Sequence, residues 1–172
     1  MFMVSVFEGV LYLLLALFLA AFCIPLFIHG APYVPVHKKR IDDMLRAAGI
    51  TIADRVADIG SGDGRFVIGA ARLGAQAVGY EINPFLVWVS RLKIRFLRLQ
   101  DLAQIRWANI WNVNFSDFTV VILFGFPYMM ERLEKKLRYE LPKGARVVSF
   151  AFKFPTWVPK SSEKGVYLYV NE

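Results

Sequence analysis

Three glycines and two carboxylates alternate over seven residues in the first half of the chain. The order is Asp58-Ile59-Gly60-Ser61-Gly62-Asp63-Gly64. Glycine is favoured where the backbone must adopt a positive φ angle or approach a ligand closely. A loop of this kind that leads into a helix presents free N–H groups and a partial positive charge. The two carboxylates, however, disfavour a diphosphate and favour a ligand that has a positively charged portion.

The spacing of these glycines separates two classes of cofactor. A dinucleotide-binding loop has the pattern G-x-G-x-x-G, whose third glycine lets helix and strand pack closely. Arg65 stands where that third glycine would be, and the pattern here is G-x-G-x-G. A further acid, Glu81, follows the next strand-like segment, where it can accept both hydroxyls of a ribose. Together these residues resemble the first motifs of class I S-adenosylmethionine (SAM) methyltransferases. A structural turn in another α/β protein is the alternative.

Strand-like and helix-like segments alternate along the chain, as in an α/β protein with a parallel sheet. Ligands of such sheets bind beyond the carboxyl ends of the strands. The SAM-loop resemblance predicts a Rossmann-like class I methyltransferase sheet of a trimmed seven-strand type, with its last strand antiparallel. The predicted strands are 56–59, 77–80, 105–108, 119–124, 145–150 and 166–170. The predicted helices are 36–48, 66–73, 84–99 and 129–141.

The fold implied by this resemblance extends the cofactor site to the ends of three strands. Asn83 is expected to cap a helix that has Pro84 in its first turn. Asn109 follows the third strand, where a carboxamide would face the adenine ring. The predicted cofactor-binding residues are Asp58, Gly60, Ser61, Gly62, Asp63, Gly64, Glu81, Ile82, Asn83, Asn109 and Ile110.

The segment after the fourth predicted strand would lie beside the methyl group. Amine methyltransferases often carry Asn/Asp-Pro-Pro-aromatic there, and this chain has Gly125-Phe126-Pro127-Tyr128 without the Asn or Asp. Backbone carbonyls near Phe124 and Gly125 would then hold an amine, with the rings of Phe126 and Tyr128 facing the cation. The residues predicted to position the substrate are Phe124, Gly125, Pro127 and Tyr128. A turn with packed aromatic side chains is the alternative.

Several longer motifs resemble one family of enzymes. They are Pro32-Tyr33-Val34-Pro35, residues 56–65, Gly79-Tyr80-Glu81-Ile82-Asn83-Pro84, Phe124-Gly125-Phe126-Pro127 and Phe154-Pro155-Thr156-Trp157. The family is the membrane-anchored protein-lysine methyltransferases that modify the c-ring protein of ATP synthase and the adenine nucleotide translocase, with small prokaryotic relatives. The resemblance implies SAM as cofactor and a lysine side chain of a protein as substrate. It departs at Asn109, where family members usually have Asp.

An apolar run at residues 9–28 contains no charged side chain. About twenty helical residues would cover the ~30 Å hydrocarbon core of a bilayer. The run therefore predicts a transmembrane anchor at residues 1–30, followed by a methyltransferase domain at 31–172. Lys38, Lys39 and Arg40 after the run predict a single-pass protein with its N-terminus outside and its catalytic domain in the cytoplasm. A cleaved signal peptide and a buried core helix are the alternatives.

The overall composition narrows the possible partners. The formal net charge is +7, which permits contact with anionic lipid, nucleic acid or an acidic protein surface. We expect no nucleic-acid partner, because no zinc, helix-turn-helix or RNA-binding motif is present. We also expect no metal site, because the two histidines have no partners in a ligand pattern. A lipid or quinone methyltransferase and a non-catalytic SAM-binding scaffold remain as alternative functions.

Overall fold

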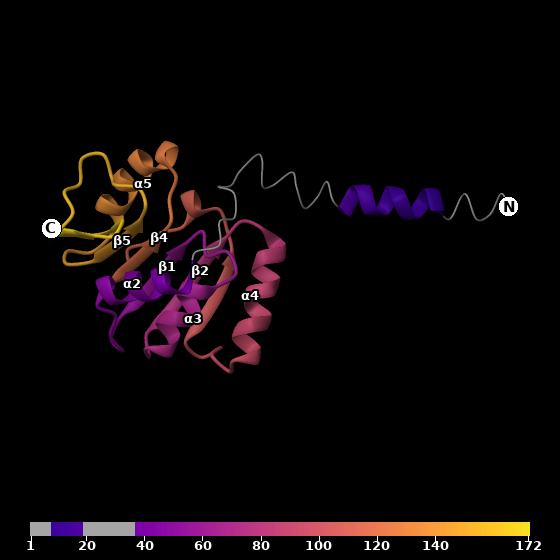
Figure 1. Cartoon of the computed structure of the whole chain (residues 1–172), viewed down its shortest axis with the longest axis horizontal. Coiled ribbons are helices and arrows are strands. Elements are labelled where there is room, and N and C mark those ends of the chain that lie inside the picture. Colours follow the sequence, from indigo (N-terminus) through magenta and orange to yellow (C-terminus); the bar gives the residue numbers. More distant parts are fainter. Residues whose placement is uncertain (1–7, 19–36) are drawn as a thin grey trace. The chain divides into compact units, whose positions relative to one another are not determined.

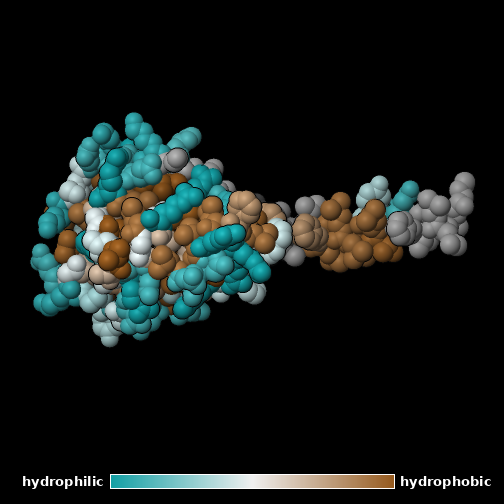
Figure 2. Space-filling view, turned by 90° about the horizontal axis from the view of Figure 1, so that it is seen from below, coloured by the Kyte–Doolittle hydropathy of each residue, from teal (hydrophilic) through white to brown (hydrophobic). Residues whose placement is uncertain are grey.

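A computed structural model describes residues 8–18 and 37–172 of the chain (Figure 1). The chain divides into two compact units, Met1–Pro32 and Tyr33–Glu172. Residues 8–18 form an α-helix whose side chains are exposed, and the described part of this helix presents an apolar surface (Figure 2).

The predicted membrane span is not supported. Within the two described ranges, no helix is both long enough and apolar enough to cross a membrane. The described helix at 8–18 rises only about 16 Å, roughly half of a bilayer core, and the rest of the apolar run, residues 19–28, lies outside the described residues. The prediction of a single-pass membrane protein with a cytoplasmic catalytic domain is therefore wrong.

A seven-stranded sheet forms the centre of the second unit, in the order β3-β2-β1-β4-β5-β7-β6. Strands β1 to β5 are parallel, β7 runs antiparallel to β5, and β6 runs antiparallel to β7. The Rossmann-like sheet with antiparallel last strands is thus confirmed. The strands are β1 (Arg55–Ile59), β2 (Gln76–Glu81), β3 (Ala103–Trp107), β4 (Val120–Leu123), β5 (Arg146–Phe150), β6 (Ser161–Glu163) and β7 (Val166–Val170).

Helices cover both faces of the sheet (Figure 1). Helices α2 (Lys38–Ala48), α3 (Arg65–Arg72) and α4 (Pro84–Phe96) bury apolar side chains with one core cluster, and α5 (Pro127–Glu140) does so with the other. Strand β4 shows the consequence, because Val120 and Ile122 join the first cluster while Val121 and Leu123 join the second. Alternate side chains of a strand point to opposite faces, so a strand covered on both sides reads as a continuous apolar run.

Two differences from the predicted elements have simple causes. Strand β6 was missed because Ser161, Ser162 and Glu163 are all polar and exposed, and therefore show no alternation. Helix α5 begins at Pro127, two residues before the predicted start, because proline is well suited to the first helical position. Pro127 and Tyr128 therefore lie in the first turn of α5, not in a loop.

Candidate active site

The glycine loop joins β1 to α3 at the carboxyl edge of the sheet. Gly60, Gly62 and Gly64 have φ angles of 74°, 53° and 81°, a region that side chains rarely tolerate. The amides of Gly60 and Ser61 both donate to the carbonyl of Tyr80, at 2.9 and 3.0 Å. The loop is therefore fastened to the end of β2, which brings the two predicted motifs together.

Glu81 ends β2 and is 8% exposed. Its Oε2 atom accepts a hydrogen bond of 2.8 Å from the amide of Gly62. Its Oε1 atom accepts hydrogen bonds from the amides of Ile82, at 2.9 Å, and Asn83, at 2.8 Å. The carboxylate thus holds the glycine loop and the start of α4 in one arrangement.

Asp58 lies near the end of β1 and is 2% exposed. Among the contacts of the described residues, neither Asp58 Oδ2 nor the buried Oγ of Ser61 has a hydrogen-bond partner. Burial, followed by the nearby charges of Glu81 and Asp63, raises the pKa of Asp58 to about 8. A buried carboxyl without a partner is costly. A ligand with a cationic donor group would satisfy both orphaned atoms, so these residues fit the positively charged portion expected of the cofactor.

Asp63 lies in a different environment although it belongs to the same loop. Its carboxylate accepts hydrogen bonds from Arg65 Nε, at 2.8 Å, and from Lys93 Nζ, at 2.7 Å. Burial alone would raise the pKa of Asp63, but the hydrogen bonds from Lys93 and Arg65 outweigh it and lower the pKa below the usual value. Asp63 is therefore an ionised residue that ties the loop to α4.

Ser90 is a residue that sequence reasoning missed. It is fully buried on α4, and its Oγ lies 2.8 Å from the carbonyl of Gly62 and 2.6 Å from that of Leu86, either of which can accept its proton. A Cβ atom on Gly64 would lie 3.1 Å from Ser90 Cβ, so the loop packs directly on this side chain. The contact joins residues 28 positions apart, and no local motif signals it.

The remaining predicted cofactor residues lie along the same edge. Asn83 caps α4, because its Oδ1 accepts from the amides of Phe85, at 2.9 Å, and Leu86, at 3.4 Å. Asn109 accepts from the amide of Trp111 at 3.1 Å and precedes the 3-10 turn η1 (Ile110–Asn112). The Nε1 atom of Trp107 donates to the carbonyl of Ile82 at 2.8 Å, which links the ends of β2 and β3.

Aromatic rings gather where β4 and β5 end. The ring of Phe124 lies 5.7 Å from those of Phe126 and Phe150 and 6.4 Å from that of Phe152, centroid to centroid. Phe126 also stacks on Tyr128 at 6.0 Å, and Tyr128 is 73% exposed. We name these five residues, Phe124, Phe126, Tyr128, Phe150 and Phe152, the aromatic cluster. Phe150 and Phe152 were not predicted to belong to it.

Gly125 allows this arrangement because it has no side chain. A Cβ atom there would lie 2.5 Å from Met130 Sδ and 3.1 Å from Leu123 Cδ1. The segment after Phe152 is anchored by Glu134 of α5, which is 4% exposed and accepts hydrogen bonds from the amide and the hydroxyl of Thr156. Both features fix the backbone that carries the aromatic cluster.

A known family matches the part of the chain that carries this site. The model of the ANTKMT methyltransferase domain matches residues 58–161, which run from Asp58 to the start of β6. The chain belongs to this methyltransferase family. The family predicted from the sequence motifs is therefore confirmed, whereas the membrane anchor implied by the resemblance is not shown.

Individual relatives agree with this assignment. The chain is 44% identical over 128 residues to the Mus musculus lysine N-methyltransferase named for the c-ring protein of ATP synthase, an alignment that covers 74% of this chain and 51% of the relative. It thus spans about half the length of that relative. It is 36% identical over 154 residues to a protein-lysine N-methyltransferase of Saccharolobus islandicus (strain REY15A), covering 84% of this chain and 96% of the relative.

A solved structure is similar in both sequence and fold. It is the crystal structure of an RNA methyltransferase from Salinibacter ruber in complex with S-adenosyl-L-homocysteine. The TM-score is 0.77 and the sequence identity 36%, covering 80% of this chain and 94% of the other.

Proposed function

We propose that this protein is a SAM-dependent methyltransferase that acts on lysine ε-amines of proteins. The observation that carries the proposal is the family match over residues 58–161. The archaeal relative supports the substrate class, because it is named a protein-lysine N-methyltransferase and is aligned over 96% of its length. The S-adenosyl-L-homocysteine held by the Salinibacter ruber enzyme supports the choice of cofactor.

The cofactor would be held by the edge that the glycine loop forms with β2 and β3. Asp58 and Ser61 have the buried acceptor atoms that suit a cationic amino group. Glu81 is the carboxylate suited to ribose hydroxyls, and Ile82, Asn83, Asn109 and Ile110 complete the nucleoside side. When bound, SAM supplies a methyl group on a sulfonium, which a neutral amine can accept by in-line displacement.

The aromatic cluster gives the substrate side its chemistry. A lysine amine has an ordinary pKa of about 10.4 and must lose its proton to become a nucleophile. Apolar rings lower the pKa of an amine by desolvating its charged form, and they attract the ammonium as it arrives. The carbonyls of Phe124 and Gly125 would orient the nitrogen, while Pro127 starts α5 and Tyr128 lies exposed at the entrance. Water can take the proton, so the reaction depends on placement more than on a dedicated base.

Labelling with tritiated SAM tests the proposal. Purified protein is incubated with a cell extract, which is then separated into protein, RNA and lipid fractions. Label on lysine in the protein fraction, confirmed by mass spectrometry and lost in Glu81→Ala, supports the proposed function. Label only in lipid favours the small-molecule alternative, and label only in RNA favours the activity named for the Salinibacter ruber relative. Binding of SAM without any label favours a non-catalytic scaffold.

A further inference from the structure

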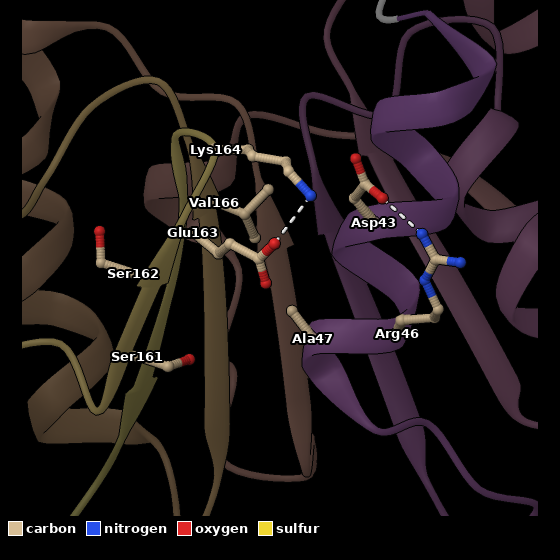
Figure 3. A pocket seen from close by; sticks show the side chains of 8 residues that line it. All are labelled: Asp43, Arg46, Ala47, Ser161, Ser162, Glu163, Lys164 and Val166. Carbon is tan, nitrogen blue, oxygen red and sulfur yellow. Dashed lines mark hydrogen bonds and ion pairs between the residues drawn. The ribbon is translucent and has the colours of Figure 1, made fainter.

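A polar groove lies between α2 and the hairpin of β6 and β7, away from the residues assigned to the cofactor (Figure 3). Its volume is about 640 Å³, within the range of ligand-binding clefts. Helix α2 and the hairpin face each other across it, and both carry charged side chains. The lining residues are Asp43, Arg46, Ala47, Ser161, Ser162, Glu163, Lys164 and Val166. We name this space the α2–hairpin groove.

One end of the groove lies at the catalytic edge of the sheet. Strand β7 pairs antiparallel with β5, with Val166 opposite Phe150, so the turn that precedes Val166 lies beside the carboxyl end of β5. The amide of Ala151 donates to the carbonyl of Gly165 at 2.8 Å. A Cβ atom on Gly165 would lie 3.6 Å from the ring of Phe150. The hairpin turn is therefore packed against a member of the aromatic cluster.

Arg40 joins the other wall of the groove to the same ring. Its guanidinium lies 5.6 Å from the centroid of Phe150 and 3.6 Å from Asp43 Oδ2. Phe150 in turn contacts Phe124, where the predicted substrate segment begins. An extended polypeptide in the groove could thus continue across Phe150 toward the aromatic cluster without leaving the surface.

The charges that the groove presents to solvent are mainly positive. Asp43 pairs with Arg46 at 2.5 Å and its side chain is only 16% exposed, whereas that of Arg46 is 74% exposed. On the hairpin, Lys164 and Glu163 pair at 2.8 Å and are 64% and 80% exposed. Exposed ion pairs contribute little to stability. Arg46 and Lys164 can therefore exchange these partners for the carboxylates of a bound chain at small cost.

We propose that the α2–hairpin groove binds an extended segment of the methyl-acceptor protein next to its target lysine, and that it favours acidic side chains in that segment. This inference rests on the proposed lysine methylation. Arg46 and Lys164 would pair with the acidic side chains from opposite walls. Ser161 and Ser162 offer hydroxyls to a peptide backbone, while Ala47 and Val166 give the groove an apolar part. The groove would thus select the sequence around the lysine, while the aromatic cluster handles the amine.

Steady-state methylation of synthetic peptides tests the groove. Each peptide has one central lysine among glycines and serines, with three glutamates before it, three glutamates after it, or glutamines in both places. We expect one of the glutamate peptides to have a KM about three- to tenfold below that of the glutamine peptide, with a similar kcat. The double variant Arg46→Glu with Lys164→Glu should lose this preference, and Arg46→Lys with Lys164→Arg should keep it.

A charge-matched control separates the groove from net charge. Arg72 ends α3 and Lys143 precedes β5, and both are exposed outside the groove. The variant Arg72→Glu with Lys143→Glu changes the total charge equally and should leave the preference intact. Equal KM values for all peptides with the wild type, or a preference that survives the groove variant, would overturn the groove proposal while lysine methylation stands. Failure of the wild type to methylate any of these peptides would count against the proposed function itself.

Discussion

The carboxylate of Glu81 accepts a hydrogen bond of 2.8 Å from the backbone amide of Gly62, and so connects the end of β2 to the glycine loop. The same side chain accepts from the amide of Asn83, the residue that caps α4. Three parts of the predicted cofactor site therefore depend on one buried carboxylate. In the proposed function this residue also receives the ribose hydroxyls, so it would both shape the site and bind the ligand.

Replacing Glu81 by alanine should lower both stability and ligand affinity. Each lost hydrogen bond to a charged acceptor costs about 1.5–3 kcal/mol, so affinity for S-adenosyl-L-homocysteine should fall at least about tenfold. Calorimetric titration measures the affinity, and urea unfolding measures the loss of stability. Glu81→Gln keeps the shape and one carbonyl acceptor and should show a smaller loss. Affinity within twofold of the wild type in Glu81→Ala would remove Glu81 from the site.

Asp58 should make the protein less stable as the pH rises. Its pKa is about 8 in the folded protein, against about 3.9 for an unperturbed aspartate. Between these values the folded state holds a proton that the unfolded state has lost, so the free energy of unfolding falls with pH by up to about 1.4 kcal/mol per unit. Asp58→Asn should lack this slope between pH 4 and 8. Urea unfolding across that range, with parallel slopes for the two proteins, would contradict the prediction.

Asp63 provides the opposite case. Its pKa is lowered in the folded state, so its contribution to stability is present at neutral pH and is lost as the pH falls. Asp63→Asn should therefore change the acid side of the stability profile and leave the slope between pH 5 and 8 as in the wild type. The same unfolding measurements compare the two variants directly.

Ligand binding should release a proton from Asp58. A cationic group placed beside this carboxyl favours its ionised form, so binding at pH 7 removes the proton that the free protein holds. Affinity for S-adenosyl-L-homocysteine should rise as the pH approaches 8. Calorimetry at pH 7 in buffers of different ionisation enthalpy should show a dependence on the buffer that disappears in Asp58→Asn. A binding enthalpy that is the same in all buffers would exclude this linkage.

The fold could be predicted where local pattern and burial agree. The strand ending at Leu123 is apolar throughout because both of its faces are covered, and Asn83-Pro84 carries the chemistry of a helix start. Strand β6 could not be found in the same way, because its three exposed polar residues pair only through the backbone of β7. The apolar run at 9–28 shows the limit of composition, since length and hydropathy alone led to a membrane span that the described residues do not support.

The candidate site was predictable where neighbours in sequence form it. The motif from Asp58 to Gly64 indicated a glycine loop, and the three positive φ angles agree with that. The partners supplied by distant elements were not visible, such as Ser90, which contacts the Gly62 carbonyl, and Lys93, which pairs with Asp63. Phe150 was interpreted as part of a strand, and only the sheet order brings its ring to Phe124.

Gly79 should be intolerant of a side chain because it supports Ser61 from β2. A Cβ atom there would lie 2.6 Å from Ser61 Cβ and 2.7 Å from Ile105 Cδ1. Gly79→Ala should therefore cost about 1–3 kcal/mol of stability and weaken the binding of S-adenosyl-L-homocysteine, because Ser61 must move. Gly144 has a φ angle of 82° and open space around it, so Gly144→Ala should cost stability through backbone strain alone. Unchanged ligand affinity in Gly79→Ala would show that the position of Ser61 does not matter.

The aromatic cluster should affect the rate of methyl transfer more than the affinity for the cofactor. Phe124→Leu and Phe126→Leu keep apolar volume but remove the ring faces that attract and desolvate an amine, so kcat on a lysine substrate should fall about tenfold or more. The affinity for S-adenosyl-L-homocysteine should stay within about twofold, because these rings lie where β4 and β5 end, apart from the glycine loop. Phe96→Leu is the matched control, since Phe96 is 88% exposed at the end of α4. The variants should also need a higher pH for full activity, because a less desolvated amine keeps its proton longer. Wild-type kcat and pH profile in both cluster variants would place the reacting amine elsewhere on this edge.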